Sequence, residues 1–411
     1  MNYELFIAKR IIAGKEYKNS ISSPIIKIAI TAIALGIIIM LIAVSTGAGL
    51  QHKIRDKMSG FKGHVQITNY NNNNSEVSLI PISKHQSFYP NFSNIDGIKK
   101  VQVFANKAGL IKTDTDFEGV VFKGVSKEYD WSFFKEYLVE GNVPNYNQNR
   151  VRDVLLSKTF VDKLQLKLND TVFATFFKDK RNRLPSSRKY VIKGIYNTGF
   201  LEFDKSMMIG DLYEVQRLNK WKEDEVGGFE VILEDFNQIK EKTKAIYTEI
   251  PPELNATSIV NAYPAIFDWI QLFDNNVWFI IAIMILVAGI NMITALLVLI
   301  LERVQMVGIL KSLGSTNMSI RKVFLYNATY LILKGLFYGN LIGLSIICIQ
   351  NYFGVITLDP ETYYVSVMPV YIDFVDVLLL NLGTLILCFL MLLIPSYIIT
   401  KIQPSKSIRF A

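Results

Sequence analysis

The chain has 411 residues, of which 50% are hydrophobic and 19% are charged, and its mean hydropathy is +0.26. Soluble domains are usually less apolar and carry about a quarter charged residues, so this composition argues against an entirely soluble protein. The formal net charge of +8 is compatible with nucleic acid binding or with anchoring at a membrane surface. The uneven spread of the basic residues favours the membrane.

Four apolar runs are long enough to cross a bilayer as helices, since about 30 Å of hydrocarbon needs roughly 20 helical residues. A long stretch of ordinary globular composition separates the first run from the second. We therefore expect an α-helical membrane protein with four transmembrane helices and a large α+β extracytoplasmic domain inserted between the first and second spans. The four runs are Ile25–Gly49, Val277–Leu301, Val323–Ile349 and Val375–Ile399.

The basic residues indicate how the chain is oriented. Lysine and arginine gather before the first run, between the second and third runs, and in the tail, whereas residues 351–374 contain neither. Because cytoplasmic loops carry the excess of these residues, we expect both termini and the loop 302–322 to be cytoplasmic and the large domain to be periplasmic.

These patterns divide the chain into nine segments. The first is amphipathic and cytoplasmic, and the large domain begins and ends with helical stalks. The expected segments are 1–24 (amphipathic), 25–49 (first span), 50–270 (large domain), 271–301 (second span), 302–322 (cytoplasmic loop with a short helix), 323–350 (third span), 351–374 (outer loop), 375–400 (fourth span) and 401–411 (tail).

Within the large domain, short alternating or apolar runs predict strands, and we expect a boundary near Gly141 between two subdomains. The domain has no cysteine, so no disulfide is expected there. The stretch Lys178–Lys189 predicts a basic hairpin loop, either simply solvated or able to capture an acidic partner. Predicted strands are 64–68, 101–105, 110–112, 120–125, 154–157, 171–177, 190–196 and 228–233, and predicted helices are 158–166, 211–218 and 239–249.

Polar and small residues within the spans predict helix packing. Gly335, Gly339 and Gly343 repeat every four residues, which permits close approach of helices within the chain or between two copies. Asn291 is expected to hydrogen-bond a neighbouring helix. Lys334 lies deep in the third run, where a charge is expensive and often functional, although its long stem could also reach the inner surface.

Catalytic motifs are missing from the sequence. No phosphate-binding loop, zinc-protease motif, nucleophile elbow or zinc-spaced cysteine pair occurs, and only three histidines are present. We therefore expect no catalytic residue and no metal site, and a non-catalytic chain that binds no cofactor of its own. If transport uses energy, a partner supplies it.

A short helix is predicted immediately after the second span. Glu302 and Arg303 end that span, and Leu313-Gly314 ends the short helix. An apolar face formed by Val307, Ile309, Leu310 and Leu313 could insert into a groove on a soluble partner, as amphipathic helices do.

These residues resemble a known family. Val287-Ala-Gly-Ile-Asn-Met292 and Val307-Gly-Ile-Leu-Lys-Ser-Leu-Gly-Ser315 are similar to the second span and coupling helix of lipoprotein-releasing (Lol) ABC transporter permeases, within the FtsX/MacB permease superfamily. The spaced glycines and the ending Gln403–Arg409 extend the likeness. Arg183–Tyr196 resembles the run after the family's chaperone-binding hairpin, the hook. Departures are Met306, where the family usually has an acidic residue, and Ala328 and Ile332, where glycine is common.

The resemblance implies two sets of site residues. The residues that would couple to the ATPase are Glu302, Arg303, Met306, Val307, Gly308, Ile309, Leu310, Lys311, Leu313 and Gly314. The candidate hook residues are Arg181, Arg183, Leu184, Pro185, Ser186 and Arg188.

The resemblance also implies partners and a location. It implies an inner-membrane permease that pairs with a second copy or a sister permease and with a cytoplasmic ABC ATPase, which binds ATP and magnesium. Lipoprotein substrate, membrane lipid and a periplasmic lipoprotein carrier chaperone complete the system, in which lipoproteins are extracted and handed to the carrier. The alternatives are a MacB-like permease that transmits mechanical work and an FtsX-like regulator of a periplasmic hydrolase.

Overall fold

The computed structural model describes residues 3–13, 22–72, 75–113, 116–146, 151–177 and 185–402. The chain divides into two compact units, and each is described by itself. The helical unit comprises Met1–Gln51, Trp269–Ile356 and Val367–Ala411. The sheet unit comprises His52–Asp268 and Thr357–Ser366.

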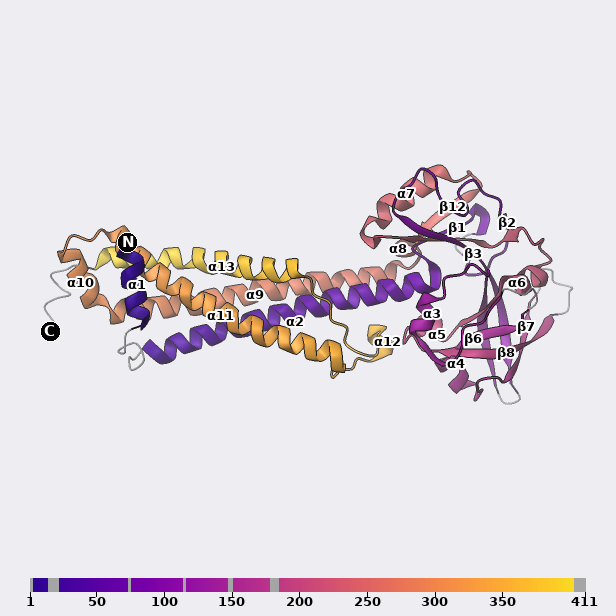
Figure 1. Cartoon of the computed structure of the whole chain (residues 1–411), viewed down its shortest axis with the longest axis horizontal. Helices are drawn as coiled ribbons and strands as arrows, with labels where there is room; N and C mark the ends of the chain where they lie inside the picture. Colours follow the sequence, from indigo (N-terminus) through magenta and orange to yellow (C-terminus); the bar gives the residue numbers. More distant parts are fainter. Residues whose placement is uncertain are drawn as a thin grey trace. The chain divides into compact units, whose positions relative to one another are not determined.

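The helical unit is built from long apolar helices that run alongside one another (Figure 1). Among the described residues, four helices are long and apolar enough to cross a membrane. A helix suits this setting because it satisfies its own backbone hydrogen bonds. The helices are α2 (Ser22–Lys62), α9 (Pro264–Glu302), α11 (Asn317–Phe353) and α13 (Phe374–Ser396), and η4 (Tyr397–Lys401) extends the last of these.

Side chains at the helix ends fix where these helices begin. The Thr316 hydroxyl accepts a hydrogen bond from the Ser319 amide and caps the start of α11, and Gly354, in the left-handed region, caps its end. Asp373 and Asp376 form a capping box at the start of α13. A further helix, α1 (Tyr3–Ala13), packs against α11.

The three spaced glycines of α11 all face α2 of the same chain. A Cβ added at Gly335 would lie 2.7 Å from the Ile33 Cβ, and one at Gly339 would lie 2.8 Å from the Ala34 carbonyl oxygen. At Gly343 the nearest atom would be the Leu41 Cδ1, at 2.9 Å. The glycines therefore allow the two backbones to approach more closely than any side chain would permit.

One side-chain amide in the apolar helices makes a different hydrogen bond from the one that the sequence predicts. Asn291 was expected to bond a neighbouring helix, but its Nδ2 donates to the Val287 carbonyl of its own helix at 3.0 Å. The amide pair that joins two helices is Asn340 on α11 with Asn381 on α13. Each Nδ2 donates to the other's Oδ1, at 2.6 and 2.9 Å.

The sheet unit contains a ten-stranded mixed sheet in the order β12-β1-β11-β3-β4-β9-β6-β8-β5, with β7 pairing β3 and β8. Consequently β3, β4, β9, β6, β8 and β7 pair in a closed ring. A separate two-stranded sheet pairs β2 (Ile82–Ser83) with β10 (Glu225–Val226). The strands of the large sheet are β1 (Val65–Asn69), β3 (Ile98–Lys112), β4 (Phe117–Val125), β5 (Leu138–Gly141), β6 (Asp153–Ser157), β7 (Thr171–Phe176), β8 (Ser186–Tyr196), β9 (Met207–Asp211), β11 (Gly228–Leu233) and β12 (Leu254–Ser258).

Aromatic side chains fill the ring of strands. Phe122 on β4 packs against Phe176 on β7 and Tyr190 on β8, with ring centroids 5.7 and 5.3 Å apart. Short helices complete the unit: α3 (Ser132–Glu136), α4 (Lys158–Lys163), α5 (Leu201–Asp204), α6 (Leu212–Asn219), α7 (Ile239–Glu249), α8 (Ile259–Ala262) and α12 (Pro360–Tyr363), with the 3₁₀ turns η2 (Tyr70–Asn72) and η3 (Phe236–Gln238).

Two details of the predicted domain are corrected. The predicted strands 101–105 and 110–112 are parts of the single strand β3. Gly141 does not divide the domain, because β5 pairs with β8 in the same sheet and Gly141 lies opposite Gly194.

Substituting Gly339 by alanine tests the packing of α11 on α2. The added Cβ meets the Ala34 backbone, so we expect the variant to lose about 1–3 kcal/mol of unfolding free energy, as overpacked sites do. The matched control is Gly383→Ala on α13, where an added Cβ meets nothing within 4 Å. Thermal unfolding of the full chain in detergent distinguishes the two, and equal stability of both variants would contradict the packing argument.

Candidate functional site

The short helix α10 (Val304–Ser312) follows α9 with a single residue, Arg303, between them. Two residues after its end lies Gly314, whose φ of +89° is in the left-handed region that glycine adopts without strain. Because only Arg303 separates α9 from α10, no flexible segment lies between them. A displacement of α10 is therefore transmitted to α9 through the backbone.

The apolar residues of α10 do not form the single free face that the sequence suggested. Val307 is fully buried, and Leu310 is partly buried against the helical core. Only Ile309 and Leu313 are substantially exposed, at 47% and 78%. Met306 also packs against that core. The surface that α10 offers to a partner is thus narrower than predicted and is centred on Ile309 and Leu313.

Lys311 joins α10 to the end of the fourth apolar helix. Its Nζ donates hydrogen bonds to three backbone carbonyls, those of Ile399 at 2.9 Å, Thr400 at 3.3 Å and Ile402 at 2.8 Å. Partial burial lowers the pKa of the Lys311 ammonium below its usual value. Carbonyls at a helix C-terminus lack helical donors and carry partial negative charge, so this cation satisfies them.

A second cation holds the same end of α13 from α11. The Arg321 Nε and Nη2 donate to the Ser396 hydroxyl at 3.2 and 3.1 Å, and Nη2 also donates to the Leu393 carbonyl at 3.3 Å. The helix α1 contacts the same loop, because the Tyr3 hydroxyl lies 2.9 Å from the Ser315 hydroxyl. The segment from α10 to the start of α11 is therefore tied to both α13 and α1.

In the sheet unit, a buried ion pair holds the last turn of α2. The side chains of Lys123 and Glu230 are each 1% exposed, and the Lys123 Nζ lies 2.6 and 2.8 Å from the two Glu230 carboxylate oxygens. The same Nζ donates to the Phe61 carbonyl at 2.6 Å. Gln102 adds a hydrogen bond to Glu230 at 3.1 Å. Burial lowers the pKa of Lys123 while the charge of Glu230 opposes that change.

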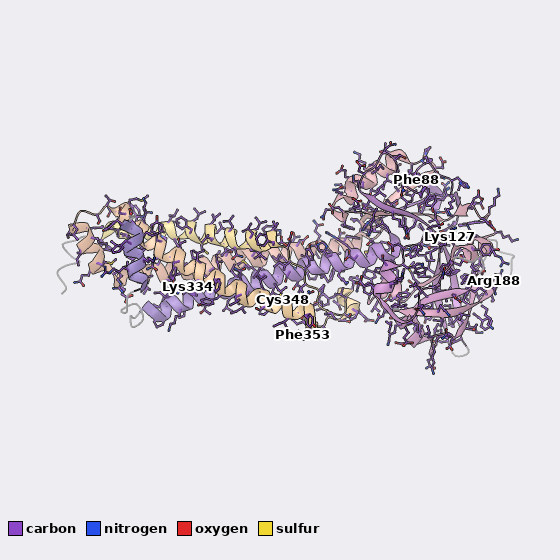
Figure 2. The ribbon with its side chains drawn as sticks, viewed as in Figure 1. Phe88, Lys127, Arg188, Lys334, Cys348 and Phe353 are labelled. Carbon is purple, nitrogen blue, oxygen red and sulfur yellow. The ribbon has the colours of Figure 1, made fainter. Side chains whose placement is uncertain are left out.

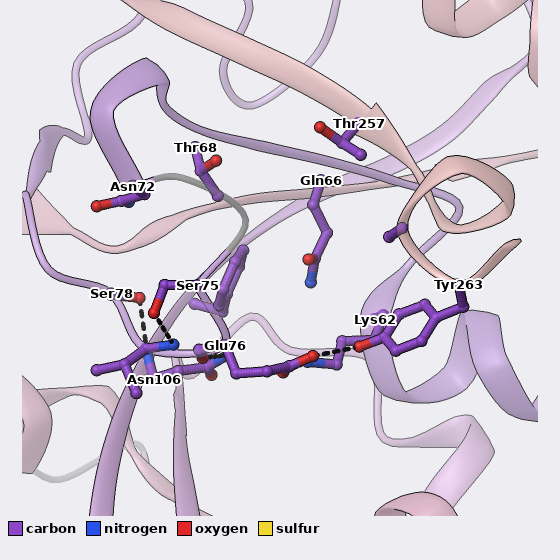
Figure 3. A pocket seen from close by; sticks show the side chains of 13 residues that line it. Lys62, Gln66, Thr68, Asn72, Ser75, Glu76, Ser78, Asn106, Thr257 and Tyr263 are labelled. Atoms are coloured by element: carbon purple, nitrogen blue, oxygen red, sulfur yellow. Dashed lines mark hydrogen bonds and ion pairs between the residues drawn. The ribbon is translucent and has the colours of Figure 1, made fainter.

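Next to this pair, Glu76 bridges two segments that lie at opposite ends of the sheet unit's sequence (Figure 3). One carboxylate oxygen pairs with Lys62, the last residue of α2, and the other accepts from the Tyr263 hydroxyl at 2.5 Å. Tyr263 immediately precedes α9. Burial acts to raise the pKa of Glu76, but the charge and hydrogen bond of Lys62 oppose it and the pKa lies below its usual value. These residues line a polar pocket, and their mutual pairing indicates a structural joint. Sequence reasoning missed it because its members are far apart in the chain.

The structure describes only some of the candidate hook residues. Arg181, Arg183 and Leu184 lie outside the described residues. Pro185 is exposed, whereas Ser186 and Arg188 belong to β8, which begins four residues earlier than predicted. Ser186 pairs with Phe176 and Arg188 with Ala174 on β7. Arg188 (Figure 2) is therefore a strand residue, and the connection between β7 and β8 is shorter than the sequence suggested.

Lys334 lies on the exposed side of α11 (Figure 2). Its Nζ is 4.7 Å from the centroid of the Tyr330 ring, one turn closer to the start of the helix. The ammonium is thus directed toward the start of α11, which agrees with a long side chain that extends along its helix toward the nearer end of the apolar segment.

Replacing Lys123 by methionine should leave the Glu230 carboxylate buried without its counterion. We expect a loss of about 3–5 kcal/mol of unfolding free energy, as found when one partner of a buried pair is removed. The double variant with Glu230→Gln should recover part of this loss. Urea unfolding of the full chain, followed by tryptophan fluorescence, measures both. Lys127→Met, at an exposed lysine on the same segment, is the control. A double variant as unstable as the sum of the single variants would contradict the pairing.

Comparison with known proteins identifies the chain's relatives. Residues 278–404 match the family described as FtsX-like permease C-terminal. The lipoprotein-releasing system transmembrane protein LolC of Neisseria meningitidis is 22% identical, with 99% of each chain covered. LolE of Haemophilus influenzae is 21% identical, also with 99% of each chain covered. An uncharacterised ABC transporter permease of Methanocaldococcus jannaschii is 26% identical over 72% of this chain and 75% of its own.

The FtsX-like match spans α9 from residue 278 onward, α10, α11 and α13, and the Lol matches add the sheet unit. With these matches, the chain carries a region similar to the FtsX-like permease C-terminal family and resembles Lol-type permeases over 99% of its length.

Proposed function

We propose that this chain is the permease subunit of an ABC transporter that extracts lipoproteins from the inner membrane and hands them to a periplasmic carrier. One observation carries the proposal. The similarity to LolC and LolE covers 99% of this chain and of each relative, so it includes the sheet unit as well as the membrane helices. Similarity in the FtsX-like C-terminal region alone would not favour lipoprotein release over the MacB-like or FtsX-like alternative.

The proposed orientation follows from the basic residues. Both termini and the loop 302–322 face the cytoplasm, and residues 63–263, between α2 and α9, form a periplasmic domain. The loop carries Arg303, Lys311, Arg321 and Lys322, whereas residues 351–374 carry no lysine or arginine. This orientation places α10 where a cytoplasmic ATPase can reach it.

The free energy that holds acyl chains in the bilayer explains why extraction would need ATP hydrolysis. Each methylene group of an acyl chain favours an apolar site by about 0.8 kcal/mol, so a protein carrying several acyl chains is held very tightly by the bilayer. In our proposal, ATP and magnesium bind to a separate ATPase subunit and not to this chain. A soluble carrier must then shield the extracted acyl chains from water.

The coupling step uses α10. Ile309 and Leu313 present the exposed apolar surface to the ATPase, and the direct junction at Arg303 passes its movement to α9. From α9 the displacement continues along the chain to Tyr263 and the Glu76 joint. Movement of packed elements as rigid bodies is a common way to transmit such changes. Two permeases, either identical or sister chains, would complete the complex.

The carrier would be held by the segment between β7 and β8. These strands form an antiparallel pair that closes at Phe176 and Ser186. The connecting residues 178–184 include Lys178, Lys180, Arg181 and Arg183, so the segment suits an acidic partner surface.

Introducing charge on the exposed apolar surface of α10 tests the coupling. The double variant Ile309→Asp and Leu313→Asp should weaken assembly with the ATPase and reduce lipoprotein release, because two apolar contacts are replaced by charges that must be desolvated. The matched control, Ile309→Val with Leu313→Met, keeps the surface apolar. Co-purification of the ATPase and release from proteoliposomes provide the readouts. Normal assembly and release in the aspartate variant would exclude α10 as the docking element.

Removing the segment between β7 and β8 tests the carrier site. A chain in which residues 178–184 are replaced by Asn-Gly, a dipeptide that favours a tight hairpin turn, should lose carrier binding and retain the ATPase. Binding of purified carrier to the detergent-solubilised complex is the measurement. A variant that instead exchanges the four basic residues of this segment for glutamine separates loss of charge from loss of length. Carrier binding that survives the deletion would refute this part of the proposal.

A further inference from the structure

We propose that Lys311 is a positioning residue through which α10 moves the cytoplasmic end of α13, so that one push on α10 drives two apolar helices. The inference rests on the proposed function only in that an ATPase moves α10. Chain connectivity already joins α10 to α9, and Lys311 adds a non-covalent connection to the fourth apolar helix.

Lys311 holds the segment after α13 by hydrogen bonds to its backbone. Its three acceptors are the carbonyl oxygens of Ile399, Thr400 and Ile402, at 2.9, 3.3 and 2.8 Å. An ammonium has three protons to donate, so the three contacts engage it fully. Because the acceptors are backbone atoms, Lys311 holds the path of the chain and not a side chain that could rotate away.

These hydrogen bonds of Lys311 lie on the side of α10 opposite the surface that would face the ATPase. Successive residues of a helix are about 100° apart, so Lys311 lies roughly 160° around the helix from both Ile309 and Leu313. Val307, only about 40° from Lys311 by the same geometry, is fully buried. One side of α10 is therefore exposed and apolar, and the other side is held against the helical unit.

Lys311 supplies an external donor to the segment that follows α13. The carbonyls that it engages are those of Ile399 and Thr400 in the short η4 turn and of Ile402, the residue after that turn. Carbonyls at the end of a helix or turn have no following N–H groups to pair with them. Without Lys311 these carbonyls would lose their charged donor, and the described hydrogen bonds between α10 and this segment would be lost.

The first test follows the end of α13 in the complete complex with its ATPase, reconstituted in liposomes. Cys348 and Cys388 are replaced by alanine, and a spin label is attached at Ile394→Cys, where the side chain is 81% exposed. We expect an ATP-dependent change in the label's spectrum that Lys311→Met abolishes and Lys311→Arg retains. Lys322→Met, which removes a nearby exposed lysine, should behave as the unsubstituted chain does.

The same variants are assayed for ATP hydrolysis and lipoprotein release. Lys311→Met should reduce release by about tenfold, within the range typical of coupling between sites, while ATP hydrolysis and ATPase binding stay close to normal. If the unsubstituted complex releases no lipoprotein but the label still responds to ATP through Lys311, the proposed function fails and this inference stands. An unchanged response in Lys311→Met, or no response at Ile394 in the unsubstituted complex, overturns the inference.

A second measurement keeps Lys311 in place and so does not depend on how the variants fold. Labels at Ser312→Cys on α10 and Ile398→Cys, at an exposed position of η4, report the distance between the two segments. If Lys311 makes them move together, ATP leaves this distance unchanged. A distance that changes with ATP in the presence of Lys311 overturns the inference.

Discussion

The close approach of α2 and α11 is the constraint on which the helical unit depends. At Gly335 and Gly339 the two helices come so near that a single added carbon would meet an isoleucine branch or a backbone oxygen. In lipid, where burial from water supplies no force between helices, such contact between backbones is a main source of association. With α11 fixed against α2, the reciprocal amides of Asn340 and Asn381 then set how α13 lies on α11.

At two places in the chain, charged side chains donate hydrogen bonds to backbone carbonyls near the end of a helix. Lys311 and Arg321 hold the final carbonyls of α13 and the turn beyond it. In the sheet unit, Lys123 holds the Phe61 carbonyl in the last turn of α2 while it neutralises Glu230. Helix ends are where backbone groups lack partners, so they are the points at which a long helix can be attached firmly to its surroundings.

Hydropathy located the four long helices because their apolar runs are unambiguous, and the relation to Lol permeases could be inferred from the segment 287–315. The contacts that define the sites could not be inferred. Backbone acceptors have no sequence signature, which hides the role of Lys311. Asn340 and Asn381 are 41 positions apart, and nothing local pairs them. The strand β9 is buried throughout, so it lacks the alternation by which strands are recognised.

The dependence of α13 on donors from earlier segments has a consequence for biogenesis. Translation makes α13 after α10 and α11, and the carbonyls at its end and in the turn beyond it accept hydrogen bonds from Arg321 and Lys311, which precede them in the chain. The donors that hold this end of α13 are therefore made before their acceptors, so α13 can dock against α10 and α11 as soon as it has been translated.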